Sequence, residues 1–323
     1  MLRLLSERIL QGLIVLLVVS GVAFALFQFV GDPVSQMLPP DATAADRAAL
    51  TEALGLNDSP LVQYLRFLGN ALAGDFGMSL RHGAPVADLI LERLPATVEL
   101  AGLAVLIALV SGIPIGILTA LRPESVLSRF ALGATLLGMS LPTFLIGILL
   151  IMIFSVMTGL LPAFGRGETV SIGFWTTGLL TADGLRHILL PALTLGVFQT
   201  ALVVRLVRGE MLEVLRRDFV KFARARGLTE RRIALSHVFR NASLPVISVM
   251  ALQFGEIIAF SVVTETVFQW PGMGMLFLQS VQFADIPVLA AYLTFIAFLF
   301  VVINLLADLG HLAVDPRLRR EGV

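Results

Sequence analysis

Long apolar runs dominate the pattern of this chain, and six of them are long enough to cross a membrane. A hydrocarbon core about 30 Å thick is spanned by about 20 residues of α-helix. Apolar windows of this length occupy residues 9–30, 98–121, 130–157, 187–207, 245–268 and 287–307. The pattern therefore predicts an all-α membrane protein with about six transmembrane helices. We expect the first run to be retained as a span, because it is longer than a signal-peptide core and five more runs follow.

Three polar segments between the spans are expected on the extracytoplasmic side of the membrane. Helix start and stop signals in the first segment, residues 31–97, predict helices over 43–54, 59–72 and 84–93, the last one ending before Pro95. The second segment, residues 158–186, is rich in Gly and Thr and predicts no clear element. The third segment, residues 269–286, opens with a turn signal at Trp270-Pro271-Gly272.

Composition agrees with a membrane protein. Hydrophobic residues make up 57% of the 323 residues, charged residues only 14%, and the mean hydropathy is +0.91. A soluble domain carries about 25% charged residues. The chain has no cysteine, so neither disulfides nor thiolate metal sites are expected to hold the extramembrane segments together.

The distribution of Lys and Arg predicts the orientation of the chain. With both termini in the cytoplasm, 17 of the 23 Lys and Arg residues lie on the cytoplasmic side, in short segments, and six lie outside. Cytoplasmic loops of membrane proteins carry such an excess of basic residues. The prediction is therefore cytoplasmic N- and C-termini.

The segment between the fourth and fifth spans is the most basic part of the chain. Residues 205–245 hold ten of the 23 Lys and Arg residues. Its apolar residues recur at helical spacing, namely Met211, Leu212, Leu215, Phe219 and Phe222. Gly227 interrupts this pattern, and Thr229 is suited to cap a second short helix that begins at Glu230. Two short helices joined at a glycine predict a shaped surface on which a partner docks.

The residues that catalysis would need are missing. A P-loop requires a Lys after a glycine-rich loop, and the only Lys, Lys221, follows Asp218-Phe219-Val220. The four histidines are His82, His187, His237 and His311. They are scattered along the chain, and none belongs to a metal-binding motif of the HExxH kind. We therefore predict a non-enzymatic subunit without cofactor, metal or nucleic-acid partner, and any ATP used must be bound by another protein.

Two acidic residues lie within or beside the fifth span. An ionisable group in a span is costly in lipid and is a functional candidate by default. Glu256 lies near the middle of the span and fits either a role in a transport pathway or coupling, or a structural hydrogen-bonded carboxylate. Glu265 lies close to the outer end, where a structural role is favoured or the side chain simply reaches water.

The basic segment resembles the cytoplasmic signature of ATP-binding-cassette importer permeases, written E-A-A-x3-G-x9-I-x-L-P. Gly227 takes the place of the signature glycine, and the E-A-A positions fall on Lys221, Phe222 and Ala223. Only Ala223 and Gly227 match literally, and the closing positions fall on residues 237–240. Residues 223–247 are nevertheless similar to the variant found in dipeptide and oligopeptide permeases of the "B" type.

The resemblance to these peptide permeases extends along the whole chain in order. The matching motifs are Gly31-Asp32-Pro33-Val34, Gly55-Leu56, Gly74-Asp75-Phe76-Gly77 with Ser79, Leu94-Pro95-Ala96-Thr97, Ser140-Leu141-Pro142-Thr143-Phe144, Glu265-Thr266-Val267-Phe268, Trp270-Pro271-Gly272-Met273-Gly274, Asn304, Asp308 and Asp315-Pro316-Arg317. Each motif alone is weak evidence, whereas their order and spacing together are strong.

The resemblance implies a type I ABC importer permease fold and a set of partners. These are a second homologous permease, two ABC ATPase subunits, an extracytoplasmic solute-binding protein and a peptide substrate, all at the lipid bilayer. It also implies that one group of residues forms the ATPase-coupling surface: Lys221, Phe222, Ala223, Arg226, Gly227, Leu228, Thr229, Arg232 and His237. The candidates for the transport pathway are Met139, Ser140, Thr143 and Glu256, the alternative for the first three being helix packing around Pro142.

The expected function is therefore import of di- or oligopeptides across a bacterial or archaeal cytoplasmic membrane. A proton-coupled secondary transporter, a membrane-embedded enzyme, and ABC import of nickel complexes or glutathione are the alternatives. We expect three regions: residues 1–97, with the first span and the outer helical segment; residues 98–310, the permease core with the cytoplasmic coupling loop 209–243; and residues 311–323, a cytoplasmic tail.

Overall fold

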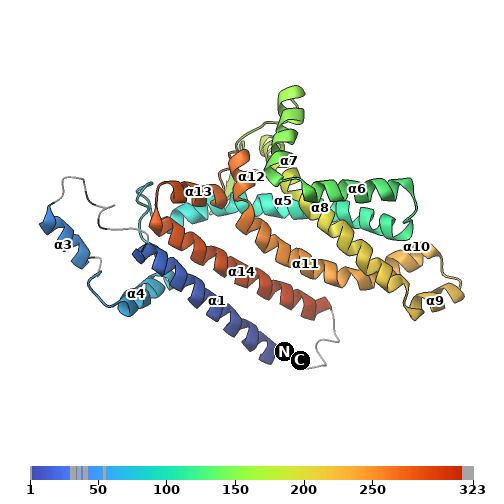
Figure 1. The fold of residues 1–323 in the computed structure, drawn as a ribbon, viewed down its shortest axis with the longest axis horizontal. Helices are drawn as coiled ribbons and strands as arrows, with labels where there is room; N and C mark the ends of the chain where they lie inside the picture. Colours follow the sequence, from blue (N-terminus) through green and yellow to red (C-terminus); the bar gives the residue numbers. More distant parts are fainter. Residues whose placement is uncertain (1, 30–33, 35–37, 39–42, 54–55, 315–323) are drawn as a thin grey trace. The chain divides into compact units, whose positions relative to one another are not determined.

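The computed structural model describes residues 2–29, 34, 38, 43–53 and 56–314 (Figure 1). Several residues of the predicted motifs lie outside this part of the chain, namely 31–33, 55 and 315–317, as do residue 54 and most of the predicted tail. The chain forms two compact units, Met1–Pro95 with Gly272–Val302 and Ala96–Pro271 with Ile303–Val323. Helices dominate both units, and the described part of the chain has a single two-stranded sheet.

The first unit is helical. Its elements are α1 (Leu2–Phe29), α3 (Ala44–Ala53), α4 (Pro60–Leu72), the start of α5 (Val86–Leu121), α13 (Met273–Gln282) and the start of α14 (Ile286–Val314). Its apolar core is built from buried residues of α5, α13 and α14, among them Val86, Ile90, Met273, Val288 and Ala291. The predicted helices over 43–54 and 59–72 correspond to α3 and α4.

A capping box starts α3. The backbone N–H of Asp46 donates to the Thr43 hydroxyl at 3.2 Å, and the backbone N–H of Thr43 donates to the Asp46 carboxylate at 3.0 Å. These bonds satisfy groups that the first helical turn leaves free. The hydrogen bonds from Thr43 also lower the pKa of the Asp46 carboxyl.

The prediction that a helix ends before Pro95 is wrong. A single helix, α5, runs for 36 residues from Val86 to Leu121 and contains Pro95 and Pro114. A proline inside a helix loses one backbone hydrogen bond. The apolar residues that follow Pro95 are fully buried, including Leu100, Ala101 and Ala104. Burial of this face offsets the lost bond, so the helix continues into the predicted second span.

The second unit contains most of the membrane helices. Its elements are the rest of α5, α6 (Val126–Ser140), α7 (Thr143–Leu150), the π-helix η1 (Ile151–Met157), β1 (Val170–Ile172), β2 (Trp175–Thr177), α8 (Ala182–Leu215), α9 (Asp218–Ala225), α10 (Glu230–Arg232), the π-helix η2 (Ile233–Val238), α11 (Phe239–Phe260) and α12 (Val262–Val267).

Two glycines bring α5 and α8 into close contact in this unit. A methyl group at Gly112 would lie 2.8 Å from the Val203 side chain, and one at Gly116 would lie 2.7 Å from Val207. The spacing of these glycines is the small-residue pattern that lets membrane helices approach closely. Helix α8 is thereby held at the centre of the unit, with Val203, Val207 and Met211 fully buried.

The predicted third span is broken in two. Residues Val126–Ser140 and Thr143–Met157 meet at an angle of 109°. The break falls at Leu141, which has extended backbone angles of φ −85° and ψ 135°. A residue before proline is driven out of the helical conformation, and Pro142 therefore explains the break. The prediction of one continuous span over 130–157 is wrong.

The number of membrane crossings agrees with the apolar pattern. Four described helices are long and apolar enough to cross a membrane, and two bent pairs raise the number to six if each pair is one span. The second bent pair, Glu230–Ser243 with Pro245–Phe260, turns by 47°. The expectation of an all-α membrane protein with about six spans is confirmed.

A buried group that we call the Glu265 junction ties α5 to the segment after α11. The Thr97 hydroxyl donates to Glu265 Oε1 at 2.7 Å, and the Ser261 hydroxyl donates to the same oxygen at 2.8 Å. The Trp270 indole N–H donates to the Ala96 carbonyl at 3.0 Å. Glu265 has an exposed fraction of 0%. The expectation that its carboxylate reaches water is wrong, whereas the structural role is supported.

The segment between η1 and α8 contains a β-hairpin, where the sequence predicted no clear element. Strands β1 and β2 form an antiparallel hairpin. Arg166 pairs with the buried Glu99 carboxylate at 2.8 Å and donates to the Thr176 carbonyl at 2.6 Å. The Trp175 indole N–H also donates to Glu99, at 3.1 Å. The hairpin is thus anchored on α5 by a partner far away in the sequence.

The segment between Trp270 and α14 contains a helix where only a turn was predicted. Helix α13 begins at Met273, after Gly272, and ends at Gln282. Asp285, just before α14, accepts a hydrogen bond of 2.5 Å from the Ser79 hydroxyl and a further one from the backbone N–H of Arg81. The Ser79 motif therefore fixes the outer segment to the start of α14.

Candidate functional site

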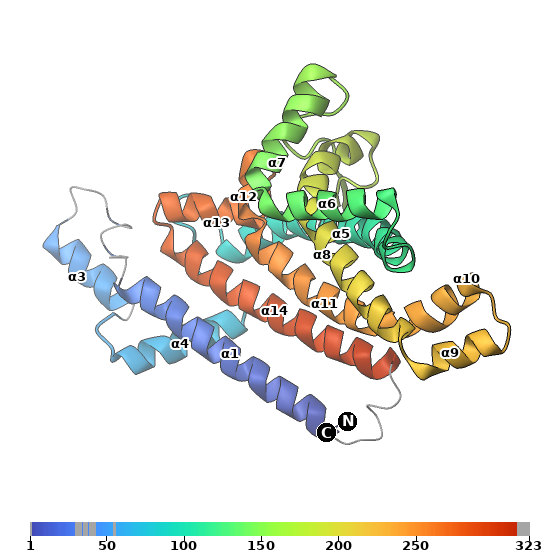
Figure 2. The ribbon, with the colours of Figure 1, turned by 45° about the vertical axis from the view of Figure 1, so that its right-hand side comes forward.

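The predicted coupling surface lies on a helical hairpin between α8 and α11. We call residues 216–238 the coupling segment; it contains α9, the turn at Gly227, α10 and η2. Figure 2 shows α9 and α10 side by side beyond the end of α8, with α10 leading into α11. The segment follows directly on α8 and leads into α11, so it is continuous with two membrane helices.

A Schellman motif reverses the chain at Gly227. The backbone N–H of Gly227 donates to the Arg224 carbonyl at 2.9 Å, and the N–H of Leu228 donates to the Ala223 carbonyl at 3.3 Å. Gly227 has a φ of +78°, a conformation that glycine adopts without steric cost. An added Cβ would meet no atom within 4 Å. No close approach of another part of this chain requires a glycine at this position, so the positive φ alone explains the glycine there.

One face of the coupling segment packs on the unit's apolar core. Val220 and Ala223 on α9 and Ile233 on η2 belong to this core, and Leu228 packs against it. Because these residues are spaced along both arms, the hairpin is held at several points. Its shape is thus set by the chain itself and does not depend on a partner.

The opposite face of α9 is exposed and combines aromatic and cationic groups. The Phe222 side chain is 64% exposed, and the Arg226 guanidinium lies 5.4 Å from the centre of its ring. Phe219 is 40% exposed. Lys221 is also exposed and forms an ion pair with Asp218 at 2.9 Å. Exposed aromatic and Arg side chains of this kind are enriched where proteins bind partners.

An ion pair closes the turn on the solvent side. Arg224 Nε donates to Glu230 Oε1 at 2.7 Å, and Arg224 Nη2 donates to Glu230 Oε2 at 3.2 Å. This two-pronged contact lowers the pKa of the Glu230 carboxyl and raises the pKa of the Arg224 guanidinium. Both side chains are about half exposed or more, so the pair contributes geometry more than stability.

The second arm begins as predicted but does not end as predicted. Thr229 has extended backbone angles and precedes α10, which begins at Glu230, while its hydroxyl makes no capping hydrogen bond. The helical conformation then continues through η2 and α11 to Phe260. The prediction of a short second helix is therefore wrong, because no breaker lies between Arg232 and the fifth span. Arg232 is exposed, whereas His237 is half-buried.

A groove lies beside the coupling segment. It has a volume of about 790 Å³ and is lined by Pro114, Ile117, Leu118, Leu121, Arg122, Glu230, Arg231, Ala234 and Leu235. Its walls are mostly apolar, and its charged residues come from the end of α5 and from α10. The coupling segment thus offers a partner an apolar recess next to an exposed cationic helix.

A second cavity lies among the membrane helices of this unit. This membrane cavity has a volume of about 330 Å³ and is lined by Thr143, Leu195, Phe198, Gln199, Gln253, Glu256, Ile257, Phe260 and Val263. Two predicted pathway residues, Thr143 and Glu256, therefore share one cavity. The break before α7 places Thr143 at the cavity wall.

The other two predicted pathway residues do not line this cavity. The Met139 sulfur accepts a contact of 3.4 Å from Arg205 Nη1, and the Ser140 hydroxyl donates to the Leu136 carbonyl at 2.8 Å. The cavity instead contains Gln199 and Gln253, which the sequence analysis missed. The sequence does hold a sign of both residues. Each is an amide side chain inside an apolar run, Gln199 at the middle of α8 and Gln253 on α11.

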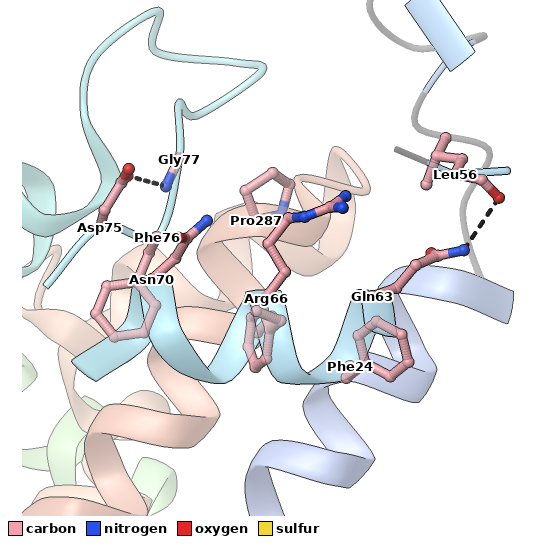
Figure 3. Close-up of a pocket in the computed structure, with 11 residues that line it drawn as sticks. Phe24, Leu56, Gln63, Arg66, Asn70, Asp75, Phe76, Gly77 and Pro287 are labelled. Carbon is pink, nitrogen blue, oxygen red and sulfur yellow. Dashed lines mark hydrogen bonds between the residues drawn. The ribbon is translucent and has the colours of Figure 1, made fainter. Parts of the chain in front are cut away.

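A third pocket lies in the first unit. Figure 3 shows its lining, which includes Phe24, Gln63, Arg66, Asn70 and Phe76, around a volume of about 240 Å³. The Gln63 amide donates to the Leu56 carbonyl at 3.0 Å, and Arg66 pairs with Asp58 at 2.6 Å. Its strongest polar groups are therefore satisfied by neighbours in the same unit, so the pocket presents no reactive cluster.

Within the part of the chain that the structure describes, no three His, Asp or Glu side chains are grouped closely enough to hold a metal ion. The described residues thus offer two functional features, an exposed coupling segment and a polar membrane cavity. Both belong to the second unit.

The sequence matches two family models that together cover nearly the whole chain. Residues 112–320 match the binding-protein-dependent transport system inner membrane component, and residues 1–101 match the N-terminal region of such membrane components. Solved structures of the MetNI methionine ABC transporter in inward-facing conformations share the fold. One of them gives a TM-score of 0.57 at 18% identity, covering 70% of this chain and 96% of that chain.

Curated relatives are similar over almost their full length. The oligopeptide transport system permease protein AppB of Bacillus subtilis is 40% identical, covering 97% of this chain and 98% of the relative. The dipeptide permease protein DppB of Escherichia coli K12 is 36% identical, covering 93% and 95%. The glutathione permease protein GsiC of the same strain is 34% identical, covering 99% of each. With a basic hairpin between two membrane helices and matches along both halves, this chain belongs to the binding-protein-dependent transport system inner membrane component family of bacterial ABC importers.

Proposed function

We propose that this chain is the transmembrane permease subunit of an ATP-driven importer that moves di- or oligopeptides into the cell. The observation that carries the proposal is the coupling segment. Its inner face is fixed on the core by Val220, Ala223 and Ile233, while its outer face presents exposed aromatic and cationic side chains. A rigid element with an open outer face is suited to receive the push of a moving ATPase.

Nine residues form the proposed ATPase-coupling surface: Lys221, Phe222, Ala223, Arg226, Gly227, Leu228, Thr229, Arg232 and His237. Their roles differ. Ala223 and Leu228 hold the hairpin on the core, and Gly227 reverses the chain. Phe222, Arg226 and the other exposed members are proposed to touch the partner.

Two ATPase subunits, a second permease and an extracytoplasmic solute-binding protein complete the proposed importer. The sequence has no P-loop, which supports ATP binding by separate subunits. The membrane cavity is lined by residues of α7, α8, α11 and α12 of one chain. A second permease would complete the pathway around it.

The proposed orientation places both termini and the coupling segment in the cytoplasm. The excess of basic residues in residues 205–245 supports this orientation. The proposed functional division keeps residues 1–97 as the N-terminal span with its outer segment, 98–310 as the permease core and 311–323 as the tail. Cysteines introduced into this cysteine-free chain test the orientation. An impermeant maleimide added to intact cells is expected to label Ala45→Cys and not Ser236→Cys, and the reverse pattern would overturn the orientation.

The peptide substrate is proposed from the relatives. Two of them are described as oligopeptide and dipeptide permeases, and a third as a glutathione permease. Glutathione is itself a short peptide, so all three names point to peptide-like cargo. Competition of labelled dipeptide uptake by unlabelled oligopeptide or glutathione would rank these substrates.

Reconstitution of the complete complex tests the function. Liposomes that contain this chain, its second permease and both ATPases, with the binding protein outside and ATP inside, are expected to take up peptide. Liposomes with this chain alone are expected to take up none and to hydrolyse no ATP. Peptide uptake by the chain alone under a proton gradient would overturn the proposal and favour a secondary transporter.

A further inference from the structure

The membrane cavity has one polar wall among apolar ones. The apolar lining comes from Leu195, Phe198, Ile257, Phe260 and Val263. The polar side consists of Gln199 on α8 and the pair Gln253 and Glu256 on α11, with Thr143 nearby. Apolar walls with a few convergent polar groups are typical of ligand sites.

The three polar side chains of α8 and α11 form a hydrogen-bonded chain. The Gln253 amide nitrogen donates to Glu256 Oε2 at 2.9 Å, and the Gln199 amide nitrogen donates to Gln253 Oε1 at 3.2 Å. An ionised carboxylate only accepts hydrogen bonds. Gln253 must therefore turn its nitrogen to Glu256 and its oxygen to Gln199, and Gln199 must in turn offer its nitrogen. The charge on Glu256 thus fixes the direction of the whole chain.

This direction leaves an acceptor at each end. The Gln199 side-chain oxygen is buried and has no hydrogen-bond partner in the structure, while the residue as a whole is only 6% exposed. At the other end, the Glu256 side chain is exposed to the cavity. Buried acceptors without partners are rare because they lose water without compensation. The Gln199 oxygen is enclosed, so the acceptor that the cavity leaves open to a ligand with N–H donors is the Glu256 carboxylate.

The charge of the cavity indicates a cation. Among the described residues that line it, Glu256 is the only charged one, and none is Lys, Arg or His. A carboxylate at membrane depth is costly unless it faces water, a partner or a ligand. A primary ammonium group carries three N–H donors, no acceptor and one positive charge. It matches the acceptor oxygens and the negative charge of Glu256, and the apolar walls beside it suit the first side chain of a peptide.

We propose that the membrane cavity is a subsite for the N-terminal ammonium group of the transported peptide, with the Glu256 carboxylate as its acceptor. This inference rests on the proposed function, since it names a contact between that importer and its cargo. Gln253 acts as the positioning residue, because Gln199 holds its amide in the orientation that donates to Glu256.

Cysteine labelling tests the subsite without any transport. The chain has no native cysteine, so Thr143→Cys places a single thiol of this chain at the cavity wall. In the assembled complex, with its other subunits made cysteine-free and without binding protein, the thiol is reacted with a cationic and an anionic methanethiosulfonate. We expect the cationic reagent to react about tenfold faster, and Glu256→Gln to abolish this preference. Thr158→Cys, at an exposed position just after η1, is the matched control. We expect Glu256→Gln to leave the labelling rates of this thiol unchanged.

Protection by peptide then identifies the group that is bound. Trialanine is expected to slow the labelling of Thr143→Cys, whereas N-acetyl-trialanine, which lacks the ammonium group, is expected not to. In the variants Glu256→Gln and Gln199→Met, trialanine is expected to give no protection of Thr143→Cys. No labelling at Thr143→Cys, equal rates for both reagents, or equal protection by both peptides would each overturn the subsite.

Uptake by the reconstituted importer gives a second readout. Glu256→Gln is expected to lower trialanine uptake about tenfold at unchanged subunit assembly, because the neutral amide loses the charge that pairs with the ammonium group. Glu92→Gln, on the exposed face of α5, is the control with normal uptake. Normal uptake by Glu256→Gln would overturn the subsite. Absence of uptake by the wild-type complex would instead overturn the proposed function, and labelling would still decide on the subsite.

Discussion

Glu256 on α11 and Glu265 on α12 lie nine residues apart and have opposite surroundings. Glu265 is fully buried and accepts hydrogen bonds from Thr97 and Ser261. Glu256 faces a cavity and accepts a hydrogen bond from Gln253, which in turn accepts one from Gln199. The same residue type therefore serves the fold in one place and remains available to a ligand in the other.

The coupling segment shows the same division within one hairpin. Its buried side chains, Val220 and Ala223, fix its shape, whereas Phe222 and Arg226 remain exposed beside them. Where the chain satisfies its own groups, we expect a substitution to lower stability. Where it leaves them open, we expect a substitution to lower transport at unchanged stability.

The largest loss of stability is expected from Glu265→Leu. The substitution removes the carboxylate oxygen that the buried hydroxyls of Thr97 and Ser261 share, at a cost of about 1–3 kcal/mol for each lost hydrogen bond. The free energy of unfolding is therefore expected to fall by about 2–5 kcal/mol. The melting temperature in detergent and the amount of chain in the membrane measure this effect, and an unchanged melting temperature would contradict the role of the junction.

Thr97→Val is expected to have a smaller effect on the same junction. It keeps the shape of the side chain and removes the 2.7 Å hydrogen bond to Glu265. Because Ser261 still donates to the carboxylate, the expected loss of stability is about 1–2 kcal/mol. A loss as large as that of Glu265→Leu would show that Thr97 alone holds the junction.

Glu256→Gln is expected to leave the stability of the chain within about 0.5 kcal/mol of the wild type, because the side chain is exposed to the cavity. Its melting temperature should match that of Glu92→Gln. A loss comparable to that of Glu265→Leu would place Glu256 with the structural carboxylates and remove the contrast between the two residues.

The smallest effect is expected from Arg224→Gln at the turn of the coupling segment. The Arg224 guanidinium lowers the pKa of the Glu230 carboxyl in the folded chain. The pair therefore contributes stability above the ordinary pKa of a glutamate, about 4.3, and that contribution is lost as the pH falls through the lowered value. The difference in melting temperature between wild type and variant should be small at pH 7 and vanish in stronger acid. A difference that grows in acid would contradict the ion pair.

The sequence predicted those features that depend on local pattern. Six apolar runs predicted six crossings, and the break in helical spacing at Gly227 predicted the reversal that its φ of +78° confirms. Thr229 and Glu230 correctly marked the start of the second arm. Each of these features is decided within a few residues of chain.

Features that depend on distant partners were missed. The hairpin of β1 and β2 rests on a pair between Arg166 and Glu99, which are 67 positions apart. A structural role was favoured for Glu265, but its partner was missed because nothing near it in the sequence points to Thr97, 168 positions away. Gln199 and Gln253 gained significance only when α8 and α11 placed them together. The break before Pro142 could have been predicted locally from the proline. It was missed because the long apolar run favoured one continuous span.

Peptide uptake by the importer with Gly227→Asp tests the central claim most directly. An added side chain at Gly227 meets no atom of this chain within 4 Å, and its strain at positive φ costs about 1 kcal/mol, so the variant should fold and reach the membrane. On the proposed coupling surface it places a new charge at the ATPase contact, where desolvation is costly. We expect normal amounts of membrane-inserted chain, weakened ATPase binding or coupling and loss of uptake, with Gly227→Ala much milder. Normal uptake by Gly227→Asp in an intact complex would contradict the account.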